Sequence, residues 1–283
     1  MYEKILVPLD CSQLAEIALS SAEELAGRLG AEIILLSVSD SPEAQDYHKH
    51  QIYTEGKVGE TIKQVEKYVE NPADKNISVK AVTLVGHPAE EIIRYAAREN
   101  VGLIVMTTHG SSGIKRWTLG RMADKVLRAT ERPLALIRAR TSSTGSAKKG
   151  VMRKALVALD GSEESEAVIP YIENLAIKLQ TEVTLLQVVA RAYRVYADAE
   201  AYLENIKNQF QSKGINTIST VRMGAAAEEI IKVADEIKTD IVAMSTHGRS
   251  GIGRWSIGSV ADKVLRGGNT PVLLVRTPGT ITG

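Results

Sequence analysis

The stretch MTTHGSSGIKRWTLGRMADKVLR, residues 106–128, decides the fold, because it returns as MSTHGRSGIGRWSIGSVADKVLR at residues 244–266. An earlier stretch, KILVPLDCS at 4–12, returns as KALVALDGS at 154–162. Self-similarity at long spacing indicates two copies of one structural unit. The offset is 150 for the earlier pair and 138 for the later pair, so the first copy contains a net insertion of twelve residues. We expect this insertion at 40–60.

Each copy alternates short apolar runs with longer amphipathic segments. Strands are predicted at 5–9, 33–38, 77–85, 103–107 and 133–138, and again near 154–159, 183–189, 218–223, 240–245 and 271–276. Helices are predicted from a cap at Ser12 or Asp10 to Gly30, and at 52–70, 89–100 and 121–130. Strands that alternate with helices pair in parallel through right-handed crossovers, and strands that are apolar throughout are covered on both faces. The fold class is therefore α/β, with two tandem doubly wound domains, each a five-stranded parallel sheet with helices on both faces.

The length of 283 residues suits two modest domains. The polar segment TSSTGSAKKG at 141–150 shows no hydrophobic periodicity and is typical of a flexible linker. We therefore expect a first domain at 1–140, a linker at 141–151 and a second domain at 152–283.

Charge and composition exclude several classes of function. Lysine plus arginine (35) nearly balance aspartate plus glutamate (34), which argues against a general DNA binder or a binder of acidic membranes. The single cysteine excludes an intramolecular disulfide framework and fits a reducing compartment. No run reaches the ~18 to 20 apolar residues of a membrane span. These features predict a cytoplasmic protein that does not enter a membrane.

A glycine-rich turn follows the fourth strand of each copy, where ligands bind in sheets of this kind. In the second copy Gly248 precedes Gly258 and Ser259, which open a helix. We expect Gly248 to supply a positive φ and a close backbone approach, and Gly258 and Ser259 to offer unpaired amides and a hydroxyl at a helix N-terminus. Arg249 and Arg254 add positive charge. The turn predicts a phosphate site, although it follows neither the GxxxxGK[ST] nor the GxGxxG pattern.

The aspartate that closes the first strand, the order of the five strands and the spacing G-x2-G-x9-G-[ST] resemble the universal stress protein family, in a tandem form that covers nearly the whole chain. The resemblance implies an adenine nucleotide alpha hydrolase-like fold with strand order 3-2-1-4-5, and ATP, with or without Mg, as ligand. In the second copy the implied ATP-binding residues are Asp160, Val188, Met244, Ser245, Gly248, Arg249, Gly258, Ser259 and Val260. In the first copy they are Pro8, Asp10, Val38, Met106, Thr107, Gly110, Gly120, Arg121 and Met122.

The two copies depart from the family pattern to different degrees. The first motif glycine is Ser245 in the second copy and Thr107 in the first, and the final serine survives only as Ser259. Its counterpart, Arg121, cannot form a compact cap, although its guanidinium can pair with a phosphate. We therefore expect the second copy to be the better nucleotide site and the first to be degenerate.

Other conspicuous residues have ordinary structural explanations. We favour a structural or ribose-side role for His109 and His247 over a catalytic one, and a helix-dipole role for Asp124 and Asp262 over magnesium binding. Packing is the favoured role of Trp117, Trp255 and Cys11. His48 and His50 are two residues apart and do not share a helix face, so no metal site is predicted. The region 40–60 remains a candidate mobile lid or partner surface.

The leading hypothesis is an ATP-binding stress-response protein that works as a nucleotide-responsive binding module, because no hydrolytic base is evident. A slow Mg-dependent ATPase and a structural or interaction protein without nucleotide remain open alternatives. The family resemblance also implies that the two domains pair through their last strands and that two chains form a homodimer.

Overall fold

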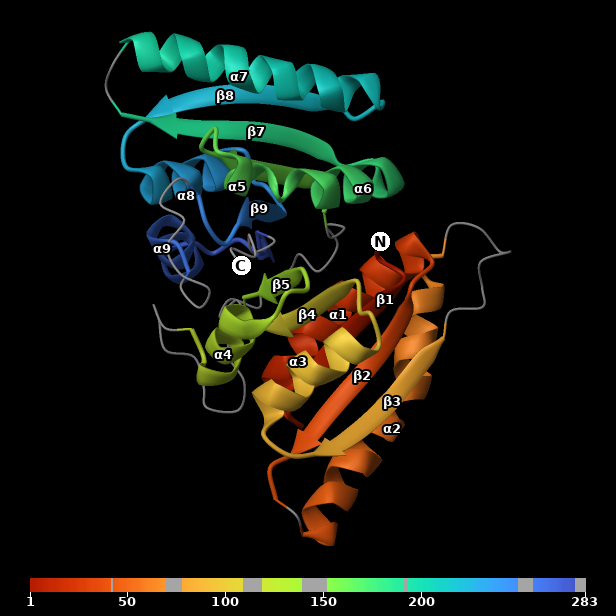
Figure 1. Cartoon of the computed structure of the whole chain (residues 1–283). Helices are drawn as coiled ribbons and strands as arrows, with labels where there is room; N and C mark the ends of the chain where they lie inside the picture. Colours follow the sequence, from red (N-terminus) through yellow and green to blue (C-terminus); the bar gives the residue numbers. More distant parts are fainter. Residues whose placement is uncertain are drawn as a thin grey trace. The chain divides into compact units, whose positions relative to one another are not determined.

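The computed structural model describes residues 1–41, 43–69, 78–108, 119–138, 152–190, 193–248 and 257–277. It divides the chain into two compact units, Met1–Gly145 and Ser146–Gly283. In each unit a set of neighbouring strands is accompanied by helices (Figure 1). The predicted linker at 141–151 lies outside the described residues.

The first unit is a five-stranded parallel sheet in the order β3-β2-β1-β4-β5. Helices α1 and α2 pack against each other, and so do α3 and α4. Because the winding direction reverses between β1 and β4, right-handed crossovers place these two pairs on opposite faces. Its elements are β1 (Lys4–Leu9), α1 (Gln13–Leu29), β2 (Glu32–Ser39), α2 (Ala44–Glu66), β3 (Val79–Val85), α3 (Pro88–Arg98), β4 (Leu103–Thr107), α4 (Arg121–Ala129) and β5 (Leu134–Ile137).

The second unit repeats this order as β8-β7-β6-β9-β10, again parallel. The helix after its first strand is broken in two, because Pro170 has no amide to continue an α-helix and instead opens the second piece. The elements are β6 (Lys154–Leu159), α5 (Glu163–Glu166), α6 (Ile169–Leu179), β7 (Glu182–Val189), α7 (Tyr193–Ser212), β8 (Thr217–Met223), α8 (Ala226–Glu236), β9 (Ile241–Ser245), α9 (Ser259–Gly267) and β10 (Val272–Val275). The predicted strand order is thus confirmed in both copies.

The core of each unit lies along its central strands. Ile5, Leu6 and Val7 of β1 are fully buried, as expected for a strand covered on both faces. The predicted limits of α1 also agree with the structure. The Ser12 hydroxyl accepts a hydrogen bond from the Ala15 amide, and Gly30 ends the helix in the left-handed region at φ 65°.

The region 40–60 differs from the prediction. Helix α2 begins at Ala44 rather than near residue 52, and it matches the position of α7 in the second unit. The connection from α2 to β3 covers 67–78, whereas the connection from α7 to β8 covers only 213–216. Most of the extra residues of the first copy therefore lie after α2.

Candidate functional site

A cavity of about 230 Å³ lies at the carboxyl ends of β6, β7 and β9 in the second unit. It is lined by every described residue that the sequence assigned to this site: Asp160, Val188, Met244, Ser245, Gly248, Gly258, Ser259 and Val260. Arg249, Arg254 and Trp255 lie outside the described residues. The turn after β9 and the N-terminus of α9 therefore meet the ends of β6 and β7 at one hollow.

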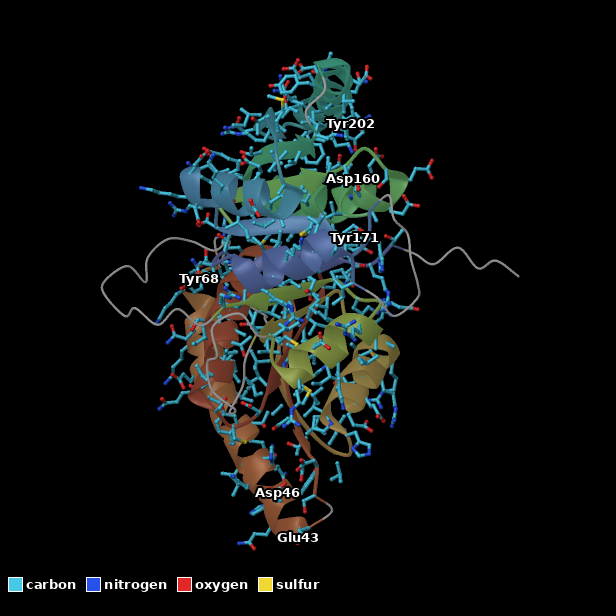
Figure 2. The ribbon with its side chains drawn as sticks, turned by 90° about the vertical axis from the view of Figure 1, so that its left-hand side faces the viewer. Glu43, Asp46, Tyr68, Asp160, Tyr171 and Tyr202 are labelled. Atoms are coloured by element: carbon cyan, nitrogen blue, oxygen red, sulfur yellow. The ribbon has the colours of Figure 1, made fainter. Side chains whose placement is uncertain are left out.

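Asp160 has a structural role in this hollow as well as a place in its wall (labelled in Figure 2). Its Oδ1 accepts hydrogen bonds from the Ser162 amide at 3.0 Å and the Ser162 hydroxyl at 2.5 Å. The Ser162 hydroxyl in turn caps α5 by accepting from the Ser165 amide. The Oδ2 atom of Asp160 faces Gly248. The carboxylate is thus held firmly in one orientation.

The two motif glycines are required for reasons that differ from the prediction. Gly248 does not adopt a positive φ; it is needed because a Cβ there would overlap the Asp160 carboxylate. The Gly258 amide is not unpaired, since it donates to the Thr246 carbonyl at 2.8 Å. A Cβ on Gly258 would lie 3.0 Å from that carbonyl oxygen. Only the following amides, from Ser259 to Ala261, open α9 without a carbonyl four residues earlier in the helix.

The polar side chains beside the glycines contact each other. His247 lines the cavity, and its Nδ1 lies 3.0 Å from the Thr246 hydroxyl. The buried Ser245 hydroxyl lies 3.1 Å from that of Thr277. The structural or ribose-side role expected for His247 stays a prediction.

Sequence reasoning missed the wall that the helix before the fourth strand contributes in each unit, α3 in the first and α8 in the second. Ala226 and Ile230 of α8 line the second-unit cavity, and Pro88 and Ile92 occupy the matching positions in the first unit. A signal was present, because AEEII occurs at both 89–93 and 227–231.

The first unit holds a cavity of about 590 Å³ at the same place. Its wall includes all the described residues assigned to the first site: Pro8, Asp10, Val38, Met106, Thr107, Gly120, Arg121 and Met122. Gly110, His109 and Trp117 lie outside the described residues. Further polar side chains line this cavity, namely Asp40, His50, His87, Glu90 and Lys125. The larger cavity therefore lies in the copy whose motif departs further from the family pattern.

Comparison with known proteins agrees with these observations. The model of the universal stress protein family matches residues 1–138 and 152–276. The chain belongs to the universal stress protein family. Universal stress protein MJ0577 of Methanocaldococcus jannaschii is 30% identical over 162 residues, which cover 50% of this chain and 98% of that protein. A universal stress protein of Methanothermobacter thermautotrophicus is 32% identical over 145 residues, covering 49% and 97%.

The tandem arrangement also has a structural relative. The crystal structure of a universal stress protein from Archaeoglobus fulgidus superimposes with a TM-score of 0.73 at 20% identity, covering 96% of each chain. At this identity the likeness concerns the fold. The curated relatives thus each match about half of this universal stress protein, whereas the solved structure matches nearly all of it.

Asp124 and Asp262 of this universal stress protein each pair with an arginine on their own helix. The Asp124 carboxylate accepts a hydrogen bond from Arg128 Nε at 2.8 Å, and the Asp262 carboxylate accepts one from Arg266 Nε at 2.9 Å. Each arginine lies one turn further along the same helix. Among the described residues no group of three or more His, Cys, Asp or Glu side chains could hold a metal ion. The geometry fits the helix-dipole and ion-pair explanation.

Cys11, the thiol beside the first cavity, lies in the left-handed region at φ 61°. Its Sγ is 3.6 Å from His50 Nδ1, and burial raises the pKa of the thiol. A raised pKa lowers the fraction of reactive thiolate, which agrees with the packing role expected from the sequence.

None of the described helices is long and apolar enough to cross a membrane.

Proposed function

We propose that this universal stress protein binds ATP in the second-domain cavity and acts as a nucleotide-responsive binding module in the response to stress. One observation carries the proposal: a single cavity combines apolar walls, an oriented carboxylate and the N-terminus of a helix. Each of these parts matches one part of an adenine nucleotide.

The apolar walls suit the adenine base. Leu186, Val188 and Met244 present aliphatic or thioether groups to the cavity, and such groups pack well on a planar ring. Asp160 lies at the edge of the same wall, where a carboxylate oxygen accepts a hydrogen bond from an exocyclic amino group. A base that carries an amino group is therefore favoured over one that carries only carbonyls.

The N-terminus of α9 suits the phosphates. The amides of Ser259, Val260 and Ala261 open the helix, and the helix dipole places about half a positive charge there. The Ser259 hydroxyl adds a further donor at the cavity wall. Charge-assisted hydrogen bonds are each worth about 1.5–3 kcal/mol, so a few of them support micromolar binding after the cost of ordering the ligand.

The first-domain cavity is a second candidate site for the same ligand. It has the corresponding apolar and acidic residues, and Arg121 stands where α9 has Ser259. A guanidinium offers two donors to one phosphate, which substitutes for the missing hydroxyl. The larger cavity volume favours the first-domain site, whereas the glycine-rich motif favours the second-domain site.

Slow Mg-dependent hydrolysis is the alternative activity. The geometry gives it little support, because His247 pairs with Thr246 and Asp262 pairs with Arg266. Phosphate release that requires Mg and disappears with Asp160→Asn would establish it. Release no faster than that of free ATP supports the binding module.

Equilibrium binding of ATP to the full chain tests the proposal, with Gly258→Asp as the diagnostic variant. This change places a negative charge and a side chain beside the Thr246 carbonyl, at the point proposed for the phosphates. We expect the second-domain binding isotherm to disappear while the first-domain signal remains. Unchanged binding in the variant would contradict the assigned site.

Assembly and location form part of the same proposal. We propose a cytoplasmic protein whose two domains pair within the chain and whose chains form a homodimer, in keeping with the family resemblance. Sedimentation of the full chain at micromolar concentration tests the dimer, and a mass equal to the 30.7 kDa of one chain would contradict it.

A further inference from the structure

Helices α2 and α7 occupy the same place in the two units and are anchored by the same contact. The Tyr53 hydroxyl donates to Glu16 Oε1 at 2.8 Å, and the Tyr202 hydroxyl donates to Glu166 Oε1 at 2.9 Å. Aligning the helices on these tyrosines also aligns their first residues, Ala44 and Tyr193. The two helices can therefore be compared position by position.

The inward face of α7 is apolar, whereas that of α2 is largely polar. In α7 the buried residues are Ala199, Leu203, Ile206 and Phe210. The counterparts in α2 are His50, Thr54, Lys57 and Thr61. Val65 is the one apolar side chain among the fully buried residues that the structure describes in α2. Because apolar burial is the main attraction between a helix and a sheet, α2 receives less of this stabilisation than α7 and relies more on polar contacts.

The seam between α1 and α2 contains an acid that has no strong partner. Glu23 is only 6% exposed, and burial raises its pKa from 4.5 to about 7. Thr61 faces this carboxyl and offsets part of the effect, but the Thr61 Oγ1 atom makes no hydrogen bond of regular geometry. The matching acid in the second unit, Glu173, is instead paired with Lys213 at 2.6 Å. Polar groups buried without full partners weaken the seam further.

The C-terminal end of α2 makes the closest contact with α1. A Cβ on Gly27 would lie 2.6 Å from the Val65 carbonyl oxygen and 2.7 Å from Tyr68 Cβ, so the backbones touch there. Figure 2 shows the two end regions of α2 well apart: Asp46 lies in the first turn of α2, and Tyr68 lies just beyond its C-terminal end. The helix is thus packed backbone to backbone at the Gly27 contact, whereas polar contacts such as Tyr53 and Lys57 with Glu16 hold the rest of its length.

The part of α2 with the polar inward face carries a wall residue of the first-domain cavity. His50 lines the cavity, and its Nδ1 lies 2.6 Å from the Ser37 hydroxyl and 3.6 Å from Cys11 Sγ. Its Nε2 lies 3.8 Å from Asp46 Oδ2 on the same helix. The counterpart of His50 in α7 is Ala199, which does not line the second-unit cavity. Movement of α2 therefore changes the first cavity, whereas no described side chain of α7 lines the second.

We propose that α2 is a displaceable helix that pivots on the Gly27 contact and gates the first-domain cavity through His50, whereas α7 is a fixed part of the second domain. The displacement follows from the contacts of α2 alone. The ligand that closes the gate, an anionic adenine nucleotide beside His50 and Arg121, rests on the proposed function. The two copies would then offer one gated site and one open site.

Hydrogen–deuterium exchange of the full chain without ligand tests the displacement directly. We expect amides of the α2 segment 44–60 to exchange at least about tenfold faster than the matching amides of α7, because three large apolar side chains are absent from its face. Equal protection of the two helices would overturn the proposal.

Matched substitutions test the cause. Thr54→Leu gives α2 the residue that α7 has at that position, and Leu203→Thr makes the reverse change in α7. We expect the first to slow α2 exchange several-fold and the second to speed α7 exchange by a similar factor. Because Thr54→Leu risks overpacking, Leu203→Thr alone remains decisive: α7 exchange that stays unchanged in this variant would contradict the stated cause.

The thiol of Cys11, the one cysteine of the chain, reports on the gate without any ligand. We expect a bulky maleimide to label Cys11 more slowly in Thr54→Leu than in the wild type at one fixed pH. Labelling that stays unchanged while α2 exchange slows would show that α2 movement does not uncover the thiol beside His50, and would overturn the gate.

Added ATP tests the coupling to ligand. We expect ATP to slow α2 exchange several-fold in the wild type and to do so much less in His50→Ala. Bound ATP without any effect on α2 exchange would overturn the coupling. Absence of ATP binding would instead contradict the proposed function, while the comparison of ligand-free α2 and α7 would still decide whether α2 is displaceable.

Discussion

Replacing Gly248 by alanine tests how the second site is built. The new Cβ would overlap Asp160 Oδ2. Since Gly248 does not adopt a positive φ, alanine brings no backbone strain of its own. Within the part of the chain that the structure describes, the atoms nearest to the new methyl group belong to the Asp160 carboxylate, so the carboxylate must rotate away or the backbone at residue 248 must shift. Either movement disturbs the wall that we propose for adenine and phosphate.

The magnitude follows from the hydrogen bonds that hold Asp160. Its Oδ1 accepts from the Ser162 amide at 3.0 Å and from the Ser162 hydroxyl at 2.5 Å. A hydrogen bond to a charged group contributes about 1.5–3 kcal/mol. If the displaced carboxylate loses one such bond to the ligand, Kd rises by a factor of about 10–100. We therefore expect Gly248→Ala to weaken ATP binding at the second site by about 10–100-fold.

Isothermal titration of the full chain with ATP measures this effect. Gly59→Ala is the matched control, because a Cβ at Gly59 meets nothing within 4 Å and the residue lies in α2, away from the second site. We expect wild-type affinity at the second site in the control. A thermal melt of each variant verifies that the second domain is folded. Wild-type affinity in folded Gly248→Ala would refute the role assigned to the contact between Gly248 and Asp160.

Three further predictions concern stability and metal dependence. Burial raises the pKa of Glu23 to about 7, and the groups that face its carboxyl are Thr61, Glu60, Lys57 and Lys67. In the unfolded chain the same carboxyl loses its proton near pH 4.5. The stability of the first domain should therefore fall as the pH rises from about 4.5 to about 7. Melting temperatures of wild type and Glu23→Gln across this range measure the effect, and parallel curves would contradict it. Gly30→Ala should cost about 1 kcal/mol of unfolding free energy in a urea titration, because residue 30 ends α1 at φ 65°, and an unchanged transition would contradict the helix-cap assignment. Asp262→Asn should leave the Mg dependence of ATP binding unchanged and cost only about 0.5 kcal/mol, because its carboxylate pairs with Arg266; a clear loss of Mg dependence would instead identify a metal ligand.

Much of the fold was predictable from local patterns. The repeated KILVPLDCS and KALVALDGS mark the two central strands, and Ser12 and Gly30 mark the limits of α1, because caps depend on the residue itself more than on its surroundings. The strand order followed from the family resemblance. The start of α2 was missed because polar residues such as His50 and Thr54 hide the 3.6-residue period on which helix prediction depends.

The site was predictable as a set of positions but not as a set of contacts. The repeated turns indicated where a ligand would bind, and the structure brings the described residues of each set to one cavity. Sequence could not show that Gly248 makes room for Asp160, or that the Gly258 amide donates to the Thr246 carbonyl, because each contact joins residues that are not neighbours in the chain. The wall of the first cavity also includes residues of α2 and α3, such as His50 and Ile92, which no local sequence pattern brings together.

The number of ATP molecules that the full chain holds at saturation tests the central claim most directly. Equilibrium dialysis against labelled ATP, with wild type and Gly258→Asp side by side, gives this number. The proposed site predicts at least one ATP per wild-type chain and a count lower by one in the variant. No bound ATP at millimolar concentration, or an identical count in the two proteins, would contradict it.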